Sequence, residues 1–112
     1  MRVLELAPQV YATGQLFETD FQLLSKQGVR SIVNTRPDGE SEGQPPSAEL
    51  TKAAAEHGIT VVHFPIDSAS MTKETAGAFM KACDELVRPM MVCARTGGLS
   101  TKIWERAEDL LD

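Results

Sequence analysis

The residues from Pro89 to Ser100 have the types and spacing needed to hold an anion. An apolar run that ends in Cys93 leads into a loop containing Gly97 and Gly98, and a helical pattern begins directly after it. A loop that turns from a strand into a helix N-terminus directs several unpaired backbone N–H groups to one point, where the helix dipole adds partial positive charge. The segment therefore predicts a cradle for phosphate, sulfate or a persulfide-bearing anion.

Cysteine-dependent phosphoryl transfer needs a thiolate at the base of such a loop and an arginine at its far end. Cys93 lies near the first position, but Leu99 occupies the second. If the Cys93 sulfur points into the loop, the loop N–H groups, Ser100 and Arg95 would lower its pKa and make it a nucleophile. A strand side chain one position away faces the other side of the sheet, however, and Cys93 is then a small buried apolar residue. Both alternatives remain open at this point.

Three further residues follow expected strands and could serve the same site. Asp67 is a candidate general acid that would protonate a leaving oxygen, although aspartate is also common in ordinary turns. Arg36 is a candidate accessory anion ligand, and its alternative roles are stacking beneath Pro37 or pairing with Asp38. Asp38 itself is expected to hydrogen-bond the loop around Arg36 and Gly39. His63 lies inside an expected strand and is interpreted as a satisfied histidine of the core or rim.

Composition limits the classes of protein to consider. The chain has 112 residues, which fits one domain over residues 1–112, and its formal net charge is −5. An acidic chain is a poor match for the phosphate backbone of a nucleic acid, so none is expected as a partner. The sequence contains no membrane span or secretory signal, and two cysteines make no disulfide framework, so a cytoplasmic location is expected. The two histidines and two cysteines lack zinc-type spacing, so neither a metal nor a cofactor is predicted.

Short β-rich runs alternate with helical patterns along the chain. Strands are expected at residues 4–6, 10–13, 29–34, 60–64 and 89–93. Alternation of this kind predicts an α/β domain with a central, mostly parallel sheet flanked by helices on both faces. The loops at the carboxyl ends of the strands, residues 34–46, 65–71 and 94–98, should share one edge, where open α/β sheets bind ligands.

Capping residues place the helices between these strands. Thr19, Ser47 and Thr72 are expected N-caps, and Gly28 and Gly58 are expected to end the first two helices. The third helix is expected to bury one stripe, and a fourth helix is expected from about Gly98. The stripe consists of Ala76, Phe79, Met80, Cys83 and Val87.

The segment from Val33 to Glu40, with Gly43-Gln44-Pro45 after it, resembles the Asn-x-Arg-Pro-Asp-Gly-Glu segment of a known family. This family is the phosphatase-like domain of the beta-lactamase hydrolase-like proteins, which is related to dual-specificity tyrosine phosphatases. The His63-Phe64-Pro65-Ile66 segment and the closing Lys102-Ile103-Trp104 fit the same family, so the resemblance covers nearly the whole chain. It implies a cysteine-phosphatase-like fold, with members that act as phosphatase-like proteins or as rhodanese-like sulfur transferases.

The signature loop of that family usually reads Cys-Arg-Ser-Gly-Thr-Arg-Ser. In an ungapped match it falls on Ala94-Arg95-Thr96-Gly97-Gly98-Leu99-Ser100, so alanine stands at the nucleophile position and leucine at the phosphate-binding arginine position. Removing one such transition-state donor costs about 3–4 kcal/mol, or ~100- to 1,000-fold in rate. A wider phosphatase spacing would make Cys93 the nucleophile, and the arginine is absent in that match as well.

Three functions are compatible with this loop. The leading interpretation is a phosphatase-like protein that binds phosphate- or sulfate-like anions without turning them over. The second is an enzyme that uses Cys93, either as a phosphatase or as a sulfur transferase, acting on a phosphorylated or persulfidated small molecule. The third is a non-catalytic interaction module with a protein partner.

Overall fold

Five strands of four residues form one sheet in the computed structural model, which describes residues 2–112. They are β1 (Leu4–Ala7), β2 (Val10–Thr13), β3 (Ser31–Asn34), β4 (Thr60–His63) and β5 (Met90–Cys93), in the spatial order β1-β2-β5-β3-β4. β1 pairs antiparallel with β2, and the other three pairings are parallel. The expected mostly parallel sheet is confirmed, with β5 at its centre.

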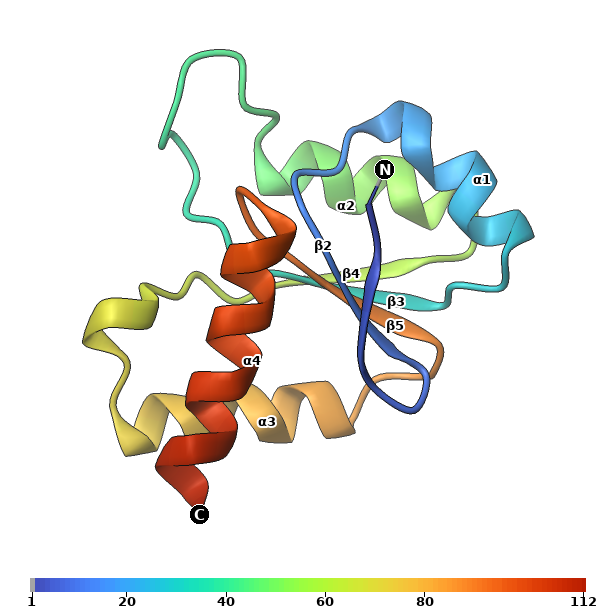
Figure 1. Ribbon diagram of the computed structural model, residues 1–112. Helices are drawn as coiled ribbons and strands as arrows, with labels where there is room; N and C mark the ends of the chain where they lie inside the picture. The colour runs from blue at the N-terminus through green and yellow to red at the C-terminus, as the bar shows by residue number, and fades with distance from the viewer. Residues whose placement is uncertain (1) are drawn as a thin grey trace.

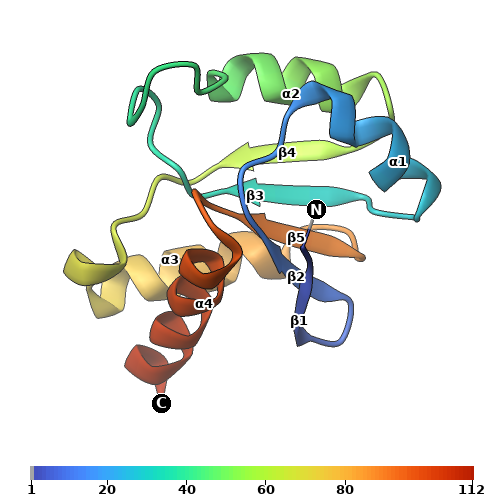
Figure 2. The ribbon, with the colours of Figure 1, turned by 45° about the horizontal axis from the view of Figure 1, so that its top comes forward.

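Helices cover both faces of this sheet (Figure 1). α1 (Phe21–Lys26) and α2 (Ser47–Ala55) lie on one face, and α3 (Lys73–Asp84) and α4 (Gly97–Leu111) lie on the other, as Figure 2 shows most clearly. Two 3₁₀ turns, η1 (Glu18–Asp20) and η2 (Ser68–Ser70), precede α1 and α3. The arrangement is the one that right-handed crossovers between parallel strands produce.

The two faces of the sheet carry two separate apolar cores. Successive strand side chains point to opposite faces, so Met91 packs with α1 and α2 while Met90 and Val92 pack with α3 and α4. All four residues of β5 are buried, which explains why this strand has the most apolar sequence. On the α3 and α4 side, Phe79 lies edge-on to Trp104 with ring centroids 6.2 Å apart.

The helix ends agree only in part with the expected caps. Thr72 caps α3, because its hydroxyl accepts a hydrogen bond from Thr75 N at 3.1 Å. The prediction for Thr19 is wrong, since this residue lies inside η1 and α1 begins later, at Phe21. The prediction for Ser47 is also wrong. Ser47 is the first residue of α2 and its side chain caps nothing at that end.

Both glycines expected to end helices are confirmed in that role. Gly28 and Gly58 follow α1 and α2 with φ angles of 92° and 73°, a left-handed conformation that glycine adopts without steric cost. Val87, by contrast, does not belong to the buried stripe of α3. That helix ends at Asp84, and Val87 is 67 % exposed.

None of the helices within residues 2–112 combines the length and the apolar character that crossing a bilayer requires.

Candidate anion-binding site

The carboxyl ends of four parallel strands meet at one edge of the sheet. Thr13 of β2 is paired with Cys93 of β5, Cys93 with Asn34 of β3, and Asn34 with His63 of β4. These four residues therefore form one row across the sheet, and the loop that follows each strand starts at this row. The predicted ligand-binding edge thus receives four loops, one more than the three expected from the sequence.

The loop after β5 turns directly into α4. Thr96 is the N-cap of α4, and its hydroxyl accepts a hydrogen bond from Leu99 N at 3.0 Å. No hydrogen bond within residues 2–112 uses the backbone N–H groups of Arg95, Thr96, Gly97 or Gly98. Such groups at a helix N-terminus attract negative charge.

The loop is fixed to the end of β2 by a hydroxyl and by a close glycine contact. The buried Ser100 donates from Oγ to the carbonyl oxygen of Thr13 at 2.7 Å. A Cβ atom on Gly14 would lie 3.4 Å from Thr96 Cα and 3.5 Å from Gly97 N, which is ordinary van der Waals contact. The backbone of the loop therefore packs directly against residues 13–14.

The side chains of Cys93 and Ala94 lie in different cores. Cys93 is 2 % exposed and packs with the α1 and α2 residues, whereas Ala94 packs with α3 and α4. The Cys93 thiol lies 3.6 Å from Asn34 Oδ1, and burial raises its pKa to about 12. A thiol in this state is protonated at neutral pH and faces away from α4, which is unfavourable for a nucleophile.

Each guanidinium nitrogen of Arg36 donates a hydrogen bond, two of them to the loop of residues 37–46 and one to Gln15. Its Nε donates to Glu40 Oε1 at 2.8 Å, its Nη1 to Gln15 Oε1 at 2.9 Å and its Nη2 to Ser41 Oγ at 2.9 Å. The carbonyl oxygen of Arg36 lies 2.8 Å from His63 Nε2. The suggested pairing of Arg36 with Asp38 is wrong, because Glu40 is the acidic partner.

Asp38 closes the same loop at its other end. Its Oδ1 accepts a hydrogen bond from the backbone N–H of Ser47 at 2.9 Å. Ser47 is the first residue of α2, so Asp38 satisfies one of the unpaired donors of that helix from nine residues upstream. The carboxylate thus acts at the helix end of the loop rather than around Gly39.

A cleft of about 480 Å³ lies between the loops that follow β3, β4 and β5. Asp67, Arg95 and Leu99 line it together with Glu40 and Ser68. Asp67 Oδ1 accepts the N–H of Ala69 at 3.0 Å, which fixes the turn η2 beside the cleft. The structure therefore brings Asp67, Arg95 and Leu99 to one cavity, and it leaves Cys93 and Ala94 buried below it.

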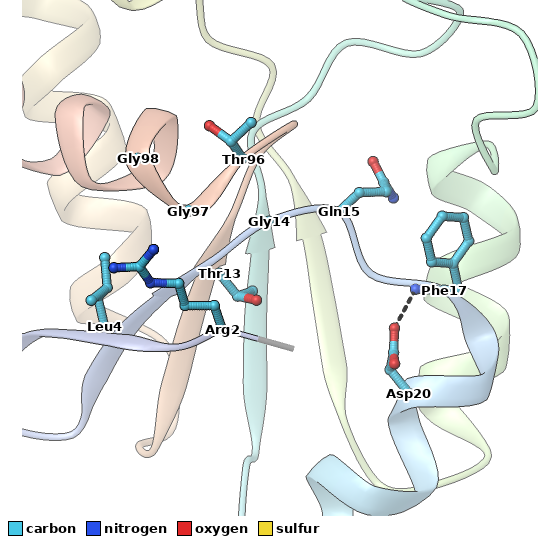
Figure 3. A pocket seen from close by; sticks show the side chains of 10 residues that line it. All are labelled: Arg2, Leu4, Thr13, Gly14, Gln15, Phe17, Asp20, Thr96, Gly97 and Gly98. Carbon is cyan, nitrogen blue, oxygen red and sulfur yellow. Dashed lines mark hydrogen bonds between the residues drawn. The ribbon is translucent and has the colours of Figure 1, made fainter.

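A second cavity, of about 620 Å³, lies on the β2 side of the same loop (Figure 3). Thr96, Gly97 and Gly98 line it from the loop and the start of α4, Thr13 lines it from the end of β2, and Arg2 lines it from the segment before β1. Sequence analysis missed this cavity. The sequence indicated the strand at residues 10–13 but carried no signal for its parallel pairing with β5, which brings the carboxyl end of β2 to the same sheet edge.

Among residues 2–112, no three His, Cys, Asp or Glu side chains gather closely enough to hold a metal ion. The polar side chains that line the cleft are the guanidinium of Arg95, the hydroxyl of Ser68 and the carboxylates of Asp67 and Glu40. The guanidinium, the hydroxyl and the N–H groups at the start of α4 suit the binding of an oxyanion, and the two carboxylates oppose it.

The fold and the position of the loop at the start of α4 define a phosphatase-like α/β domain of the protein tyrosine phosphatase type. Residues 2–110 match the family model described as "Beta-lactamase hydrolase-like protein, phosphatase-like domain", and the chain belongs to this family. The resemblance seen in the sequence is confirmed.

Relatives of known sequence are longer than this chain. It is 29% identical over 110 residues to the beta-lactamase hydrolase-like protein of Agrobacterium fabrum and 27% identical over 108 residues to that of Xylella fastidiosa. These matches cover 98% and 96% of this chain but only 26% and 25% of the relatives. The chain thus spans about a quarter of the length of these relatives.

Solved structures give the same fold. A Neisseria meningitidis protein described as a candidate phosphatase superposes with a TM-score of 0.84 at 27% identity, over 93% of this chain and 74% of that one. TpbA of Pseudomonas aeruginosa superposes with a TM-score of 0.66 at 13% identity, over 98% and 66% of the two chains. At that identity the second likeness concerns the fold alone.

Proposed function

We propose that this domain recognises a phosphate-type anion in the cleft beside residues 94–99 and does not turn it over by covalent catalysis. The observation that carries the proposal is the placement of two neighbouring residues. The position that opens the loop is a buried alanine, Ala94, and the only adjacent thiol, that of Cys93, is buried on the opposite face of the sheet.

The charges of the cleft support anion binding of modest strength. Arg95 is exposed, lines the cleft, and forms no ion pair within residues 2–112. Its guanidinium is free to bind two oxygens of one phosphate group. Asp67 and Glu40 line the same cleft and their carboxylates oppose an anion, although Glu40 is paired with Arg36. Leu99 contributes no charge where the family has an arginine. We therefore expect weaker binding than in a loop with two arginines.

The fold supports phosphate as the anion. One solved structure of the same fold is P. aeruginosa TpbA in complex with phosphotyrosine, at 11% identity to this chain. A phosphomonoester carries three acceptor oxygens, which match the Arg95 guanidinium and the hydroxyl of Ser68 at the cleft wall. Phosphorylated small molecules or phosphorylated side chains are the proposed ligand class.

The chemistry of Cys93 argues against the two enzymatic alternatives. A phosphatase or a sulfur transferase requires an accessible thiolate. The Cys93 sulfur would have to cross from the α1 and α2 core to the cleft, and burial holds its pKa at about 12. Phosphoryl transfer also needs a donor where Leu99 stands, and this position supplies none.

Two measurements test the proposal. Release of nitrophenol from 4-nitrophenyl phosphate, and transfer of sulfur from thiosulfate to cyanide, should equal the uncatalysed rates. Titration of the ¹⁵N-labelled protein with inorganic phosphate should shift the amide signals of Ser68, Arg95 and Leu99. Arg95→Gln should weaken this binding by about tenfold, as expected for loss of one charged hydrogen-bonding group, and the control Arg106→Gln, at an exposed position of α4, should not.

Turnover that disappears in Cys93→Ser would contradict the proposal and favour the enzyme. If inorganic phosphate shifts no amide signal, the proposal is also contradicted. The non-catalytic interaction module is then the function that remains. The ¹⁵N spectrum of each variant reports whether the fold is intact, so loss of binding can be separated from unfolding.

A further inference from the structure

Two opposite charges line the cleft beside residues 94–99 without pairing with each other. Arg95 and Asp67 both line this cavity, and both residues are exposed. No ion pair within residues 2–112 involves either of them, so no carboxylate oxygen of Asp67 lies within 4.0 Å of an Arg95 guanidinium nitrogen. Each of the two charges is therefore free to contact a ligand.

We propose that the ligand of this cleft is a small phosphomonoester that also carries an ammonium group, with its phosphate at Arg95 and its ammonium at Asp67. The inference rests on the anion binding proposed above and names the class of phosphorylated molecule that the cleft prefers. A purely anionic ligand brings its negative charge close to the carboxylates of Asp67 and Glu40, whereas a ligand with both charges places a cation there.

The hydroxyl group of Ser68 independently indicates a ligand in this cleft. Ser68 lines the cavity and is only 7 % exposed. No hydrogen bond within residues 2–112 uses its Oγ, and this atom is not among the side-chain atoms that lack both solvent access and a partner. The hydroxyl therefore opens toward the cleft. Buried polar groups are normally paired, and an oxygen of a bound phosphate would pair this one.

The carboxylate of Asp67 is held in place and keeps one oxygen unused. Its Oδ1 accepts the N–H of Ala69 at 3.0 Å, while no hydrogen bond within residues 2–112 uses its Oδ2. Glu40 is less suited to bind an ammonium group, because its Oε1 already accepts from Arg36 Nε at 2.8 Å and the guanidinium balances its charge. Of the two carboxylates, Asp67 is thus the one whose negative charge has no partner.

The spacing and the remaining wall of the cleft suit a short organic molecule. Asp67 and Ser68 are consecutive, and neighbouring Cα atoms lie about 3.8 Å apart, a separation that a two-carbon link between phosphate and ammonium can span. Pro37, Ile66 and Leu99 also line the cleft and offer apolar surface to such a link. The volume of about 480 Å³ is that of a small-molecule pocket.

Two esters that differ in one group test the inference. 2-Aminoethyl phosphate carries the ammonium group, and propyl phosphate has a methyl group in its place. At about pH 7.5 both phosphate groups are almost fully ionised and the amine is protonated. In ¹⁵N NMR titrations of the full chain, both esters should shift the amide signals of Arg95 and Leu99. 2-Aminoethyl phosphate should bind about fivefold more tightly, as expected for one exposed ion pair.

The amide signal of Ala69 reports the ammonium group directly. Its N–H donates to Asp67 Oδ1, so a cation that binds this carboxylate should change the signal. We expect 2-aminoethyl phosphate to shift the Ala69 signal and propyl phosphate to leave it nearly unchanged.

The variant Asp67→Asn separates a local preference from the charge of the whole protein. The chain has a formal net charge of −5, which favours the less negative ester at any site. Asp67→Asn keeps an oxygen for Ala69 N and removes the carboxylate charge. It should reduce the preference to less than about twofold, and it should bind propyl phosphate about twofold more tightly because a repulsion is lost. Damage to the fold does not produce such a gain in affinity.

Control variants make matched changes. Asp109→Asn removes the same charge from an exposed position of α4 outside the cleft and should leave the preference at about fivefold. Ser68→Ala and Arg95→Gln should each weaken the binding of both esters by about tenfold and preserve the preference, because both esters place their phosphate at these side chains.

The preference decides this inference, and the binding of phosphate itself decides the function proposed for the cleft. Equal affinity for the two esters overturns the inference, as does a preference that is the same in Asp67→Asn as in Asp109→Asn. If both esters still shift the signals of Ser68, Arg95 and Leu99 in that case, the function proposed for the cleft stands. If neither the esters nor inorganic phosphate shift these signals, both the inference and the proposed function fail.

Discussion

Cys93 and Ala94 are consecutive in the sequence, yet their side chains belong to the two different cores of the domain, on opposite faces of the sheet. The alternation of a β-strand causes this separation. A shift of one residue would exchange the two side chains, and the buried contacts of Met91 and Val92 hold the register against such a shift. The thiol and the loop are therefore close along the chain but separated by the sheet.

We expect both thiols to be unreactive in the folded protein. Burial raises the pKa of Cys93 and that of Cys83 from 9.0 to about 12, which lowers the thiolate fraction near neutral pH by about 1,000-fold. Reaction with Ellman's reagent at pH 8 should be at least about 100-fold slower in buffer than in concentrated urea. The Cys83→Ala variant isolates the signal of Cys93. Rapid labelling of that variant in its folded state would contradict the buried position of the sulfur.

The same pKa values predict a loss of stability in alkali. Below pH 9 the two thiols are neutral in both the folded and the unfolded chain. Between about pH 9 and 12 the unfolded chain releases these protons while the folded protein keeps them, so the free energy of unfolding should fall as the pH rises. Urea denaturation from pH 8 to 11 measures this slope. The Cys83→Ala variant should show a smaller slope, and an equal slope would indicate that other groups cause the effect.

The sheet could be predicted from the sequence because its strands carry clear local signals. Residues 89–93 form an apolar run, and residues 29–34 contain the β-branched Val29, Ile32 and Val33; each segment contains an observed strand. The family resemblance also located the loop that opens α4, and the expected start at about Gly98 differs from the observed start at Gly97 by one residue.

The contacts of the site could not be predicted, because they join residues that are distant in the sequence. Arg36 binds Gln15, 21 residues away, and nothing in the local pattern distinguishes this partner from the nearer Asp38. Asp38 caps α2 from nine positions upstream, whereas the local sequence pattern indicates the serine at the helix start as the cap. The second cavity is lined by Arg2, Thr13 and Gly97, and only the sheet order brings these residues to one place.

Asp38 is expected to stabilise the start of α2. Asp38→Ala should lower the free energy of unfolding by about 1 kcal/mol, the usual effect of losing a helix-capping side chain. Asp38→Asn should retain most of the stability, because its amide oxygen can accept the same N–H group of Ser47. Glu42→Ala is the matched control, since Glu42 is an exposed acidic residue of the same loop. Equal urea midpoints for the two alanine variants would show that the capping bond contributes nothing.

A single substitution at Leu99 should strengthen the binding of phosphate in the cleft. It is half-buried at the cleft wall beside Arg95, so Leu99→Arg can place a second guanidinium in the cleft. The substitution removes the apolar contacts of Leu99 with the α3 and α4 core, so the ¹⁵N spectrum of the variant must first show an intact fold. We expect about tenfold tighter binding of inorganic phosphate, measured by ¹⁵N NMR titration, because a charged hydrogen bond to an anion contributes roughly this much. Leu111→Arg, at an exposed leucine near the end of α4, is the control and should bind phosphate as the unaltered protein does.

The same variant separates binding from catalysis. Leu99→Arg alone should still fail to hydrolyse 4-nitrophenyl phosphate, because it supplies the transition-state donor but no nucleophile in the cleft. Hydrolysis by this single variant, lost again when Cys93→Ser is added, would mean that the Cys93 thiol reaches the cleft despite its burial. If Leu99→Arg binds phosphate no better than Leu111→Arg does, then the cleft beside Arg95 is not the anion site. The combination of tighter binding and absent turnover is the result that a cradle without a nucleophile requires.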